Sequence, residues 1–191
     1  MVSRAAAPPR VLYSRRRIAR RVAAIARSVD DFYGRRPLTL CGVLTGGAVF
    51  AADLARALRN DRVEIDFLKA SSYGRGRVSK GRVDLQILDE GGIAGRDVLV
   101  VEDILETGRT LSAVVGALRL CGARSVRTAV LLVKPVARAV PFEPDWVGFD
   151  MEEDLFVAGY GLDAGKRFRN LPDIVVARKA GRGAPREAVR R

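Results

Sequence analysis

Runs of aliphatic residues long enough to form a strand alternate along this chain with segments of helical periodicity. The aliphatic runs predict buried strands at 38–44, 98–101 and 126–133, with shorter candidates at 63–68, 147–149, 156–158 and 174–176. Apolar residues at helical spacing predict helices at 15–33, 49–58 and 110–120. Strands that are apolar on both faces need cover on both faces, which parallel sheets receive from their crossover helices. The pattern therefore predicts an α/β fold with a mostly parallel, twisted sheet flanked by helices.

The formal net charge of +12 comes from the two ends of the chain. Residues 1–21 carry seven arginines and no acidic residue, and residues 178–191 carry six basic residues and one acidic residue. Basic ends of this kind are usually solvated tails with weak affinity for polyanions, so we expect no specific nucleic-acid partner. The predicted organisation is a basic disordered extension at 1–10, one domain at 11–177 and a basic disordered tail at 178–191.

The sequence contains no histidine, which excludes Ser/His/Asp catalysis and His-ligated zinc. Chemistry has to rely on carboxylates, Lys, Tyr, Arg, backbone amides or a metal held by oxygen. Cys41 and Cys121 lie far apart in apolar surroundings, which favours buried thiols in a reducing compartment. No apolar run approaches the roughly 20 residues that cross a bilayer, and residues 1–10 lack the apolar core of a secretory signal. We expect a soluble, cytoplasmic protein without a membrane partner.

The segment Val98–Leu111 carries the strongest chemical signal. Four aliphatic residues deliver Glu102 and Asp103 to the end of a predicted strand, and a short turn leads directly into a predicted helix. Backbone amides at that helix start would form an anion cradle, and the adjacent carboxylates suit ribose hydroxyls, so the segment fits a sugar phosphate. An ordinary acidic turn that caps a helix is the alternative for Glu102 and Asp103 taken alone.

This segment resembles the phosphoribosyl-pyrophosphate signature of type I phosphoribosyltransferases, and the rest of the chain resembles the hypoxanthine-guanine phosphoribosyltransferase family. The resemblance runs in order from about Val11 to Val176. The segments that carry it are a pyrophosphate loop at 43–47, the start of a lid at 66–74, a strand ending in a purine-binding lysine at 131–135, and hood segments at 146–149, 156–163 and 168–172. The resemblance implies the phosphoribosyltransferase fold, with a mobile lid at 71–92 and a small hood at about 145–177 over the base site.

The resemblance also implies a role for each matching residue. Glu102 and Asp103 would contact the ribose hydroxyls directly or through Mg²⁺, and Asp163 would bind a Mg²⁺ held by pyrophosphate. The 5′-phosphate would lie against the loop residues Thr107, Gly108, Arg109, Thr110 and Leu111. Pyrophosphate would be held by Thr45, Gly46, Gly47 and Arg169, with Ser72 and Tyr73 of the lid against the substrate. The purine would be bound by Lys134, Phe156 and Val157.

Each of these residues has an ordinary structural interpretation when it is considered alone. Phe156 would then be a core aromatic, Lys134 a solvated cation, Asp163 the start of a glycine turn and Arg169 a surface charge. Two positions also depart from the family pattern. Glu106 stands where the family generally has an Asp beside the purine imidazole nitrogen, and Thr45 stands where the loop often has a Lys. The catalytic carboxylate is therefore predicted to be Glu106, one methylene longer than usual.

The predicted reaction is the joining of hypoxanthine or guanine to phosphoribosyl pyrophosphate with Mg²⁺ as cofactor, giving IMP or GMP. The resemblance suggests a homodimer or homotetramer. Two alternatives stay open: a regulator that keeps the fold and only senses its ligand, with the basic tails on nucleic acid, and an enzyme of this fold that prefers xanthine or a pyrimidine.

Overall fold

The computed structural model describes residues 9–72, 83–87 and 93–177, and these residues contain a six-stranded sheet in the order β4-β3-β2-β5-β6-β7. Its strands are β2 (Leu38–Leu44), β3 (Val63–Ser72), β4 (Val83–Ile87), β5 (Asp97–Leu105), β6 (Ser125–Val133) and β7 (Trp146–Asp150). Pairing is parallel from β3 through β7, and β4 is antiparallel to β3 at one edge. The predicted α/β fold with a mostly parallel sheet is confirmed.

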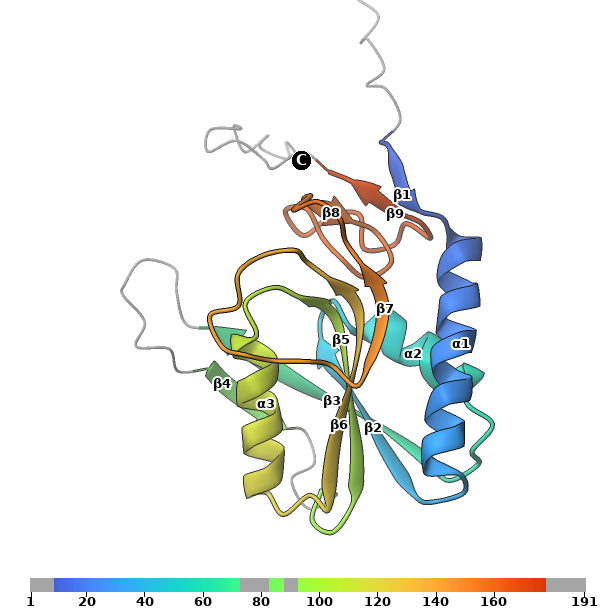
Figure 1. Ribbon diagram of the computed structural model, residues 1–191, viewed down its shortest axis with the longest axis vertical. Helices are drawn as coiled ribbons and strands as arrows, with labels where there is room; N and C mark the ends of the chain where they lie inside the picture. The colour runs from blue at the N-terminus through green and yellow to red at the C-terminus, as the bar shows by residue number, and fades with distance from the viewer. Residues whose placement is uncertain (1–8, 73–82, 88–92, 178–191) are drawn as a thin grey trace, which may run out of the picture.

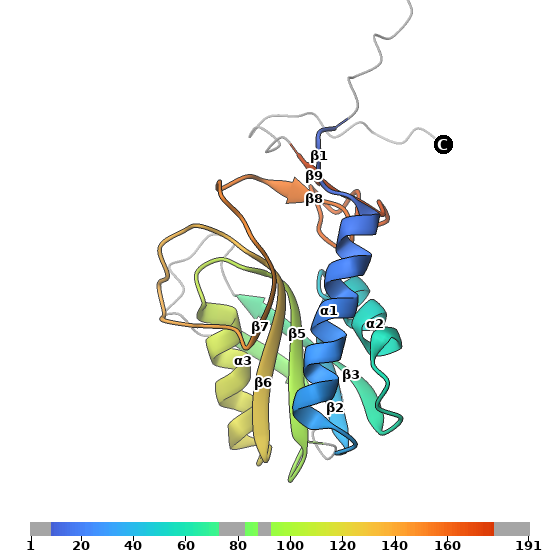
Figure 2. The ribbon, with the colours of Figure 1, turned by 45° about the vertical axis from the view of Figure 1, so that its right-hand side comes forward.

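Three helices in the described residues cover the two faces of this sheet, as Figures 1 and 2 show from two sides. α1 (Arg15–Tyr33) and α2 (Ala48–Ala57) lie on one face, and α3 (Arg109–Leu120) lies on the other. Each face has its own apolar cluster, one built with residues of α1 and α2 and the other with residues of α3. The double cover explains why the central strands are apolar on both faces.

α1 illustrates how the sequence determines a helix. The Ser14 side chain caps its start by accepting a hydrogen bond from the Arg17 amide at 3.4 Å. Gly34 ends the helix with φ of 58°, in the region that glycine tolerates. The buried face consists of apolar residues three or four positions apart: Ile18, Val22, Ile25, Ala26, Val29 and Tyr33. The predicted helix at 15–33 has these same bounds.

β5 is longer than its aliphatic run. The prediction of a strand at 98–101 followed by an acidic turn is wrong in its end point, because β5 continues pairing with β6 until Leu105 faces Val133. Pairing with β2 ends earlier, where Val101 faces Gly42. Glu102 and Asp103 therefore lie within the last residues of a strand rather than after it.

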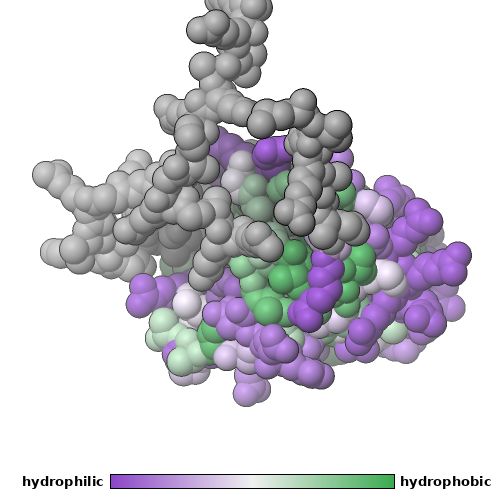
Figure 3. Space-filling view, turned by 90° about the horizontal axis from the view of Figure 1, so that it is seen from above, coloured by the Kyte–Doolittle hydropathy of each residue, from purple (hydrophilic) through white to green (hydrophobic). Residues whose placement is uncertain are grey.

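A small antiparallel sheet in the order β1-β9-β8 lies above the carboxyl ends of the main strands. Its strands are β1 (Val11–Tyr13), β8 (Val157–Ala158) and β9 (Ile174–Val176). We call this small sheet and the loop at 159–173 the hood. β1 was not predicted, although it is as long as β9, which was predicted at 174–176. The view from above shows hydrophobic side chains gathered near the middle of this end, with hydrophilic side chains around them (Figure 3). β7, which opens the predicted hood range at 145–177, belongs to the main sheet.

Most of the predicted lid at 71–92 lies outside the residues that the structure describes. β3 runs to Ser72 and pairs with β4, so the start of the 71–92 segment forms a hairpin. Residues 73–82 and 88–92 are not described, nor are the predicted tails at 1–8 and 178–191. The predicted domain boundaries stay predictions.

A buried carboxylate joins the amino ends of two central strands. Asp97 of β5 is 2% exposed and accepts hydrogen bonds from Arg124 Nε at 3.0 Å and from Ser125 Oγ at 2.6 Å. The Arg124 guanidinium holds the pKa of Asp97 below its usual value, and the Ser125 hydroxyl acts in the same direction. This cluster ties the start of β5 to the start of β6, at the end of the sheet away from the hood.

Replacing Asp97 by Asn should destabilise the fold by about 2 kcal/mol at pH 7, the range for a hydrogen bond to a charged group. Because folding lowers the Asp97 pKa, its contribution is complete above the unfolded value of about 3.9 and is lost as the pH falls through the folded value. Urea unfolding at pH 7 and in acid would measure both effects. The control is Asp61→Asn, which breaks an exposed pair with Arg35 and should change little. Equal effects of the two substitutions would contradict this prediction.

Candidate functional site

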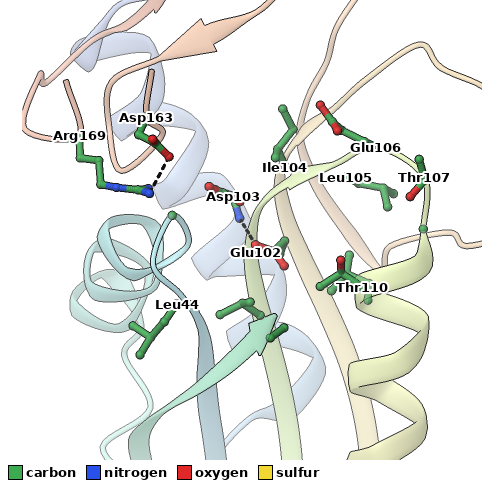
Figure 4. A pocket seen from close by; sticks show the side chains of 15 residues that line it. Leu44, Glu102, Asp103, Ile104, Leu105, Glu106, Thr107, Thr110, Asp163 and Arg169 are labelled. Atoms are coloured by element: carbon green, nitrogen blue, oxygen red, sulfur yellow. Dashed lines mark hydrogen bonds and ion pairs between the residues drawn. The ribbon is translucent and has the colours of Figure 1, made fainter. Parts of the chain in front are cut away.

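A cavity of about 290 Å³ opens at the carboxyl ends of β2 and β5, beneath the hood. Figure 4 shows its three walls: the end of β5 in the centre, the start of α3 on one side, and a hood loop on the other. Its lining consists of Val43, Leu44, Gly46, Ala70, Glu102, Asp103, Ile104, Leu105, Glu106, Thr107, Gly108, Thr110, Leu111, Asp163 and Arg169. Many of these residues are the ones that the sequence predicts for phosphate, ribose and pyrophosphate.

The acidic pair Glu102–Asp103 forms the floor of this cavity. Glu102 is 7% exposed, and its Oε1 accepts a hydrogen bond from the Asp103 amide at 3.2 Å. The Asp103 carboxylate lies directly against Gly46, and any side chain at position 46 would collide with it. The glycine is therefore needed for the turn after β2 to approach β5 this closely.

Burial raises the pKa of both carboxyl groups. For Glu102 the loss of solvent acts first and the neighbouring Asp103 charge adds to it, so the pKa lies well above its ordinary value. Burial also raises the pKa of Asp103, although its hydrogen bonds and the Arg169 charge oppose the shift. Two such groups side by side favour a ligand that supplies positive charge or hydroxyl donors.

The loop between β5 and α3 has the geometry of an anion cradle. Gly108 has φ of 80° and precedes α3, whose first amides have no acceptor within the helix. The Thr107 carbonyl accepts hydrogen bonds from the amides of Ala139 and Val140 at 3.0 and 3.1 Å. The side of Gly108 that would carry a Cβ faces the Val140 carbonyl at a distance too short for one. The loop after β6 therefore holds the cradle in place, and this support was not predictable from the local pattern.

Asp163 and Arg169 lie on the opposite wall, in the hood loop that follows β8 (Figure 4). They form an ion pair with 2.6 Å between Arg169 Nη2 and Asp163 Oδ1. Arg169 Nη1 also donates to the Gly161 carbonyl at 2.5 Å. The predicted pyrophosphate residues thus face the acidic pair across the cavity, with Arg169 as the nearby positive charge.

Lys134 comes directly after β6 and is held beside this cavity rather than in its lining. Its Nζ lies 2.7 Å from Glu106 Oε1 and 3.0 Å from Asp154 Oδ1, and the residue is 8% exposed. Burial would lower the pKa of Lys134, but the two carboxylates outweigh burial and the pKa is raised. Glu106 is therefore paired with the residue that was predicted to bind the purine.

Other predicted residues lie at the margins of the cavity or outside it. Thr45, Gly47 and Arg109 adjoin lining residues, and the Leu44–Thr45 peptide bond is cis. Phe156 and Val157 do not line this cavity; Phe156 is half-buried beside β8, and the Val157 side chain is buried. The side chain of Ser72 and all of Tyr73 lie outside the described residues.

Several apolar residues of the lining lie in segments that the sequence marked but were given no role of their own: Val43, Leu44, Ala70, Ile104 and Leu105. Ile104 and Leu105 continue the aliphatic pattern beyond the acidic pair. That continuation could have indicated that β5 does not stop at Val101.

No group of three or more His, Cys, Asp or Glu side chains converges as a metal site within the described part of the chain. Magnesium that acts on a phosphorylated substrate commonly uses one or two carboxylates together with substrate oxygens. The pair Glu102–Asp103 fits that requirement, because a cation would compensate two adjacent carboxylates whose pKa values are raised. Asp163 lies on the opposite wall, where its Oδ1 is paired with Arg169 and its Oδ2 accepts a hydrogen bond from the Lys166 amide at 2.7 Å.

Comparison with known proteins identifies the family. The model of the phosphoribosyl transferase domain matches residues 11–164. The chain belongs to the phosphoribosyltransferase family. Within it, the chain falls among the hypoxanthine-guanine phosphoribosyltransferases, and it is 39% identical over 172 residues to the one from Bacillus subtilis, covering 90% of this chain and 94% of that protein.

Other members of this family extend the comparison. The bifunctional protein TilS/HprT of Listeria monocytogenes is 42% identical over 166 residues, and the matched region covers 86% of this chain but 25% of that protein. The chain thus spans about a quarter of the length of that relative. A crystal structure of a hypoxanthine phosphoribosyltransferase from Staphylococcus aureus has a TM-score of 0.81 at 35% identity, covering 88% of this chain and 90% of the other. These matches confirm the predicted phosphoribosyltransferase fold.

Among the described residues, no helix is both long and apolar enough to cross a bilayer.

Replacing Glu102 by Gln should stabilise the free protein at neutral pH. Because folding raises the Glu102 pKa, the folded state favours the protonated carboxyl, and stability falls as the pH rises from the ordinary glutamate value towards the folded one. Removing the charge should raise the Tm at pH 8 by about 2–4 °C, which corresponds to about 1 kcal/mol for a chain of this size. Differential scanning calorimetry would measure it, with the exposed Glu153→Gln as control. A lower Tm for Glu102→Gln would show that the buried charge is already compensated.

Proposed function

We propose that this chain is a purine salvage enzyme that transfers the phosphoribosyl group of phosphoribosyl pyrophosphate to hypoxanthine or guanine. The products would be IMP or GMP and pyrophosphate. One observation carries the proposal: an acidic pair, the buried Glu102 and the half-buried Asp103, shares one cavity with a helix-start anion cradle and a hood-borne arginine. The names of relatives such as the Bacillus subtilis protein support the same activity.

The sugar phosphate would span the cavity from the cradle to the hood. The amides and hydroxyls at 107–111 would hold the 5′-phosphate at the positive start of α3. Glu102 and Asp103 would accept hydrogen bonds from the ribose 2′- and 3′-hydroxyls. Pyrophosphate would lie between the turn at 45–47 and Arg169, whose planar fork suits phosphate oxygens.

Magnesium would be held by the acidic pair and by Asp163, together with substrate oxygens. When bound, it would supply positive charge to the pyrophosphate oxygens and ease their departure. In the loaded site the ion pair between Arg169 and Asp163 would break. Arg169 would then pair with pyrophosphate, and Asp163 would pair with Mg²⁺. The positive charge of Mg²⁺ would also offset the loss of solvent at the two floor carboxylates, which is the first cause of their raised pKa values.

The purine would enter next to Glu106 and Lys134. The Lys134 ammonium would donate to the 6-oxo group, Phe156 would stack on the ring, and the backbone of Val157 would contact its 2-position. A ring nitrogen forms the bond to C1 of the ribose while the bond from C1 to pyrophosphate breaks with its electron pair. The Glu106 carboxylate accepts the proton of the imidazole N–H, so the purine carries no extra positive charge after the new bond forms. Positive charge develops on the sugar at this point, and the floor carboxylates stabilise it.

Three further features belong to this proposal. The lid at 71–92, with Ser72 and Tyr73, would exclude water, because hydrolysis of the activated sugar is the competing reaction. The enzyme would act as a homodimer or homotetramer. A cytoplasmic location is supported by the two free cysteines, Cys41 and Cys121.

A product assay with separate bases tests the proposal. With phosphoribosyl pyrophosphate and Mg²⁺, hypoxanthine and guanine should be converted, and adenine should be much poorer. The reason is that the Lys134 ammonium meets a donor amine on adenine, which leaves both unpaired at a cost of about 1–3 kcal/mol, or roughly 5- to 150-fold.

Each contrary result identifies an alternative. Equal turnover of adenine and hypoxanthine would show that Lys134 does not select for a 6-oxo group. Preference for xanthine or uracil would make this an enzyme of the same fold with another base. Binding of phosphoribosyl pyrophosphate without transfer to any base would favour the ligand-sensing regulator.

Replacing Glu106 by Gln should lower turnover by at least about tenfold, because general bases contribute about 10²–10⁴-fold. Binding of phosphoribosyl pyrophosphate should barely change, since Glu106 faces the base side of the cavity. Steady-state kinetics and calorimetric titration would separate the two quantities. The matched variant Glu106→Asp keeps the carboxylate and should retain or improve activity. Wild-type turnover in Glu106→Gln would reduce Glu106 to a structural acid.

A further inference from the structure

One cation, Lys134, is shared by two carboxylates that belong to different segments. Glu106 follows β5, and Asp154 lies between β7 and β8. Their oxygens lie 2.7 and 3.0 Å from Lys134 Nζ, so two of the three ammonium protons are engaged. Asp154 carries no role in the reaction as described above, yet it touches the residue that would recognise the base.

The backbones around this cluster are tied together. The Lys134 amide donates to the Leu105 carbonyl at 3.0 Å. Arg138 Nη1 donates to the Lys134 carbonyl at 3.3 Å and also to the Glu106 carbonyl. The Glu106 side chain has 51% of its surface accessible and the Asp154 side chain has 54%, so burial fixes neither carboxylate. Glu106 can therefore leave Lys134 by rotation while its own main chain stays in place.

Glu106 and Asp154 would have different roles once the purine binds, because only Glu106 has a second partner in the proposed reaction. When the 6-oxo group of the purine accepts a hydrogen bond from Lys134, Glu106 turns to the imidazole N–H and can no longer hold the ammonium. Lys134 is 8% exposed, and a buried ammonium without a carboxylate is costly. Asp154 is the carboxylate that stays, and the Met151 amide, which donates to the Val133 carbonyl at 2.9 Å, ties its segment to the end of β6.

We infer that Asp154 is a positioning residue of the base site: it holds the Lys134 ammonium while Glu106 exchanges that ammonium for the purine. The inference rests on the proposed function, since it assigns Lys134 to the 6-oxo group. It also gives a role to the longer side chain of Glu106. In the free protein Glu106 is paired with Lys134, and the purine would break this pair by binding to both residues.

The Glu106→Asp variant follows from the same geometry. Removing one methylene withdraws the carboxylate by about 1.5 Å, one C–C bond, so it should no longer reach Lys134 at hydrogen-bond distance. The competitor of the 6-oxo group is then absent. The KM for hypoxanthine should fall severalfold, and the KM for phosphoribosyl pyrophosphate should stay within a factor of two.

The test of Asp154 compares two ligands that share the phosphate and ribose but differ in the base. Calorimetric titration of Asp154→Asn with IMP should show binding about fivefold weaker than wild type, while ribose 5-phosphate binds equally well. Asp154→Glu should recover part of the IMP affinity. The control is Glu153→Gln, which removes an adjacent exposed carboxylate that is not one of the two in contact with Lys134.

The outcomes separate this inference from the proposed function. Unchanged IMP affinity in Asp154→Asn, or an equal loss for IMP and ribose 5-phosphate, would overturn the positioning role. A wild-type protein that binds neither ligand would instead overturn the proposed function. The expected result is a selective loss for IMP, matched in kinetics by a higher KM for hypoxanthine at nearly constant kcat.

Discussion

The unequal pairing of β5 with its two neighbours is the constraint on which the site depends. β5 separates from β2 beyond Val101 but stays paired with β6 as far as Leu105. The crossover from β2 runs through α2 on one face, and the crossover from β5 runs through α3 on the other. Neighbouring strands whose connections leave in opposite directions create a crevice at their carboxyl ends, the usual ligand position in open α/β sheets. The acidic pair, the glycine turn and the cradle all border this crevice.

Stability and function oppose each other on the floor of the crevice. Glu102 is buried and Asp103 beside it is half-buried, and loss of solvent raises the pKa of both because the free protein offers them little compensating charge. At the other end of the same strand, Asp97 has a lowered pKa because Arg124 and Ser125 satisfy it. β5 thus begins with Asp97, whose charge is compensated by Arg124, and ends near Glu102 and Asp103, whose charges would be compensated by a ligand. Sites that store unfavourable electrostatics in this way are typical of binding and catalysis.

The sequence allowed much of the fold to be predicted, and the reason differs between elements. The long helix α1 and the apolar strand β2 were predicted with their observed bounds, since periodicity and burial reinforce each other over many residues. The strand β1 was not predictable, because it exists only through pairing with β9. The acidic pair and the cradle were readable because they are local in sequence. The pairing of Lys134 with Glu106 and Asp154 was not, since it joins three segments through tertiary contact.

The hood joins the two ends of the described chain, with Val11 of β1 opposite Val175 of β9. This pairing spans nearly the whole sequence, so its contact order is very high and its loop-closure entropy is large. During synthesis the central strands and their helices emerge before residue 174, and they can pack while the hood is still missing. A ribosome-bound chain would then hold the cradle and the acidic pair but lack Asp163, Arg169 and the closing strand. Completion of the candidate site therefore belongs to the last stage of folding, and β1 stays without its partner until that stage.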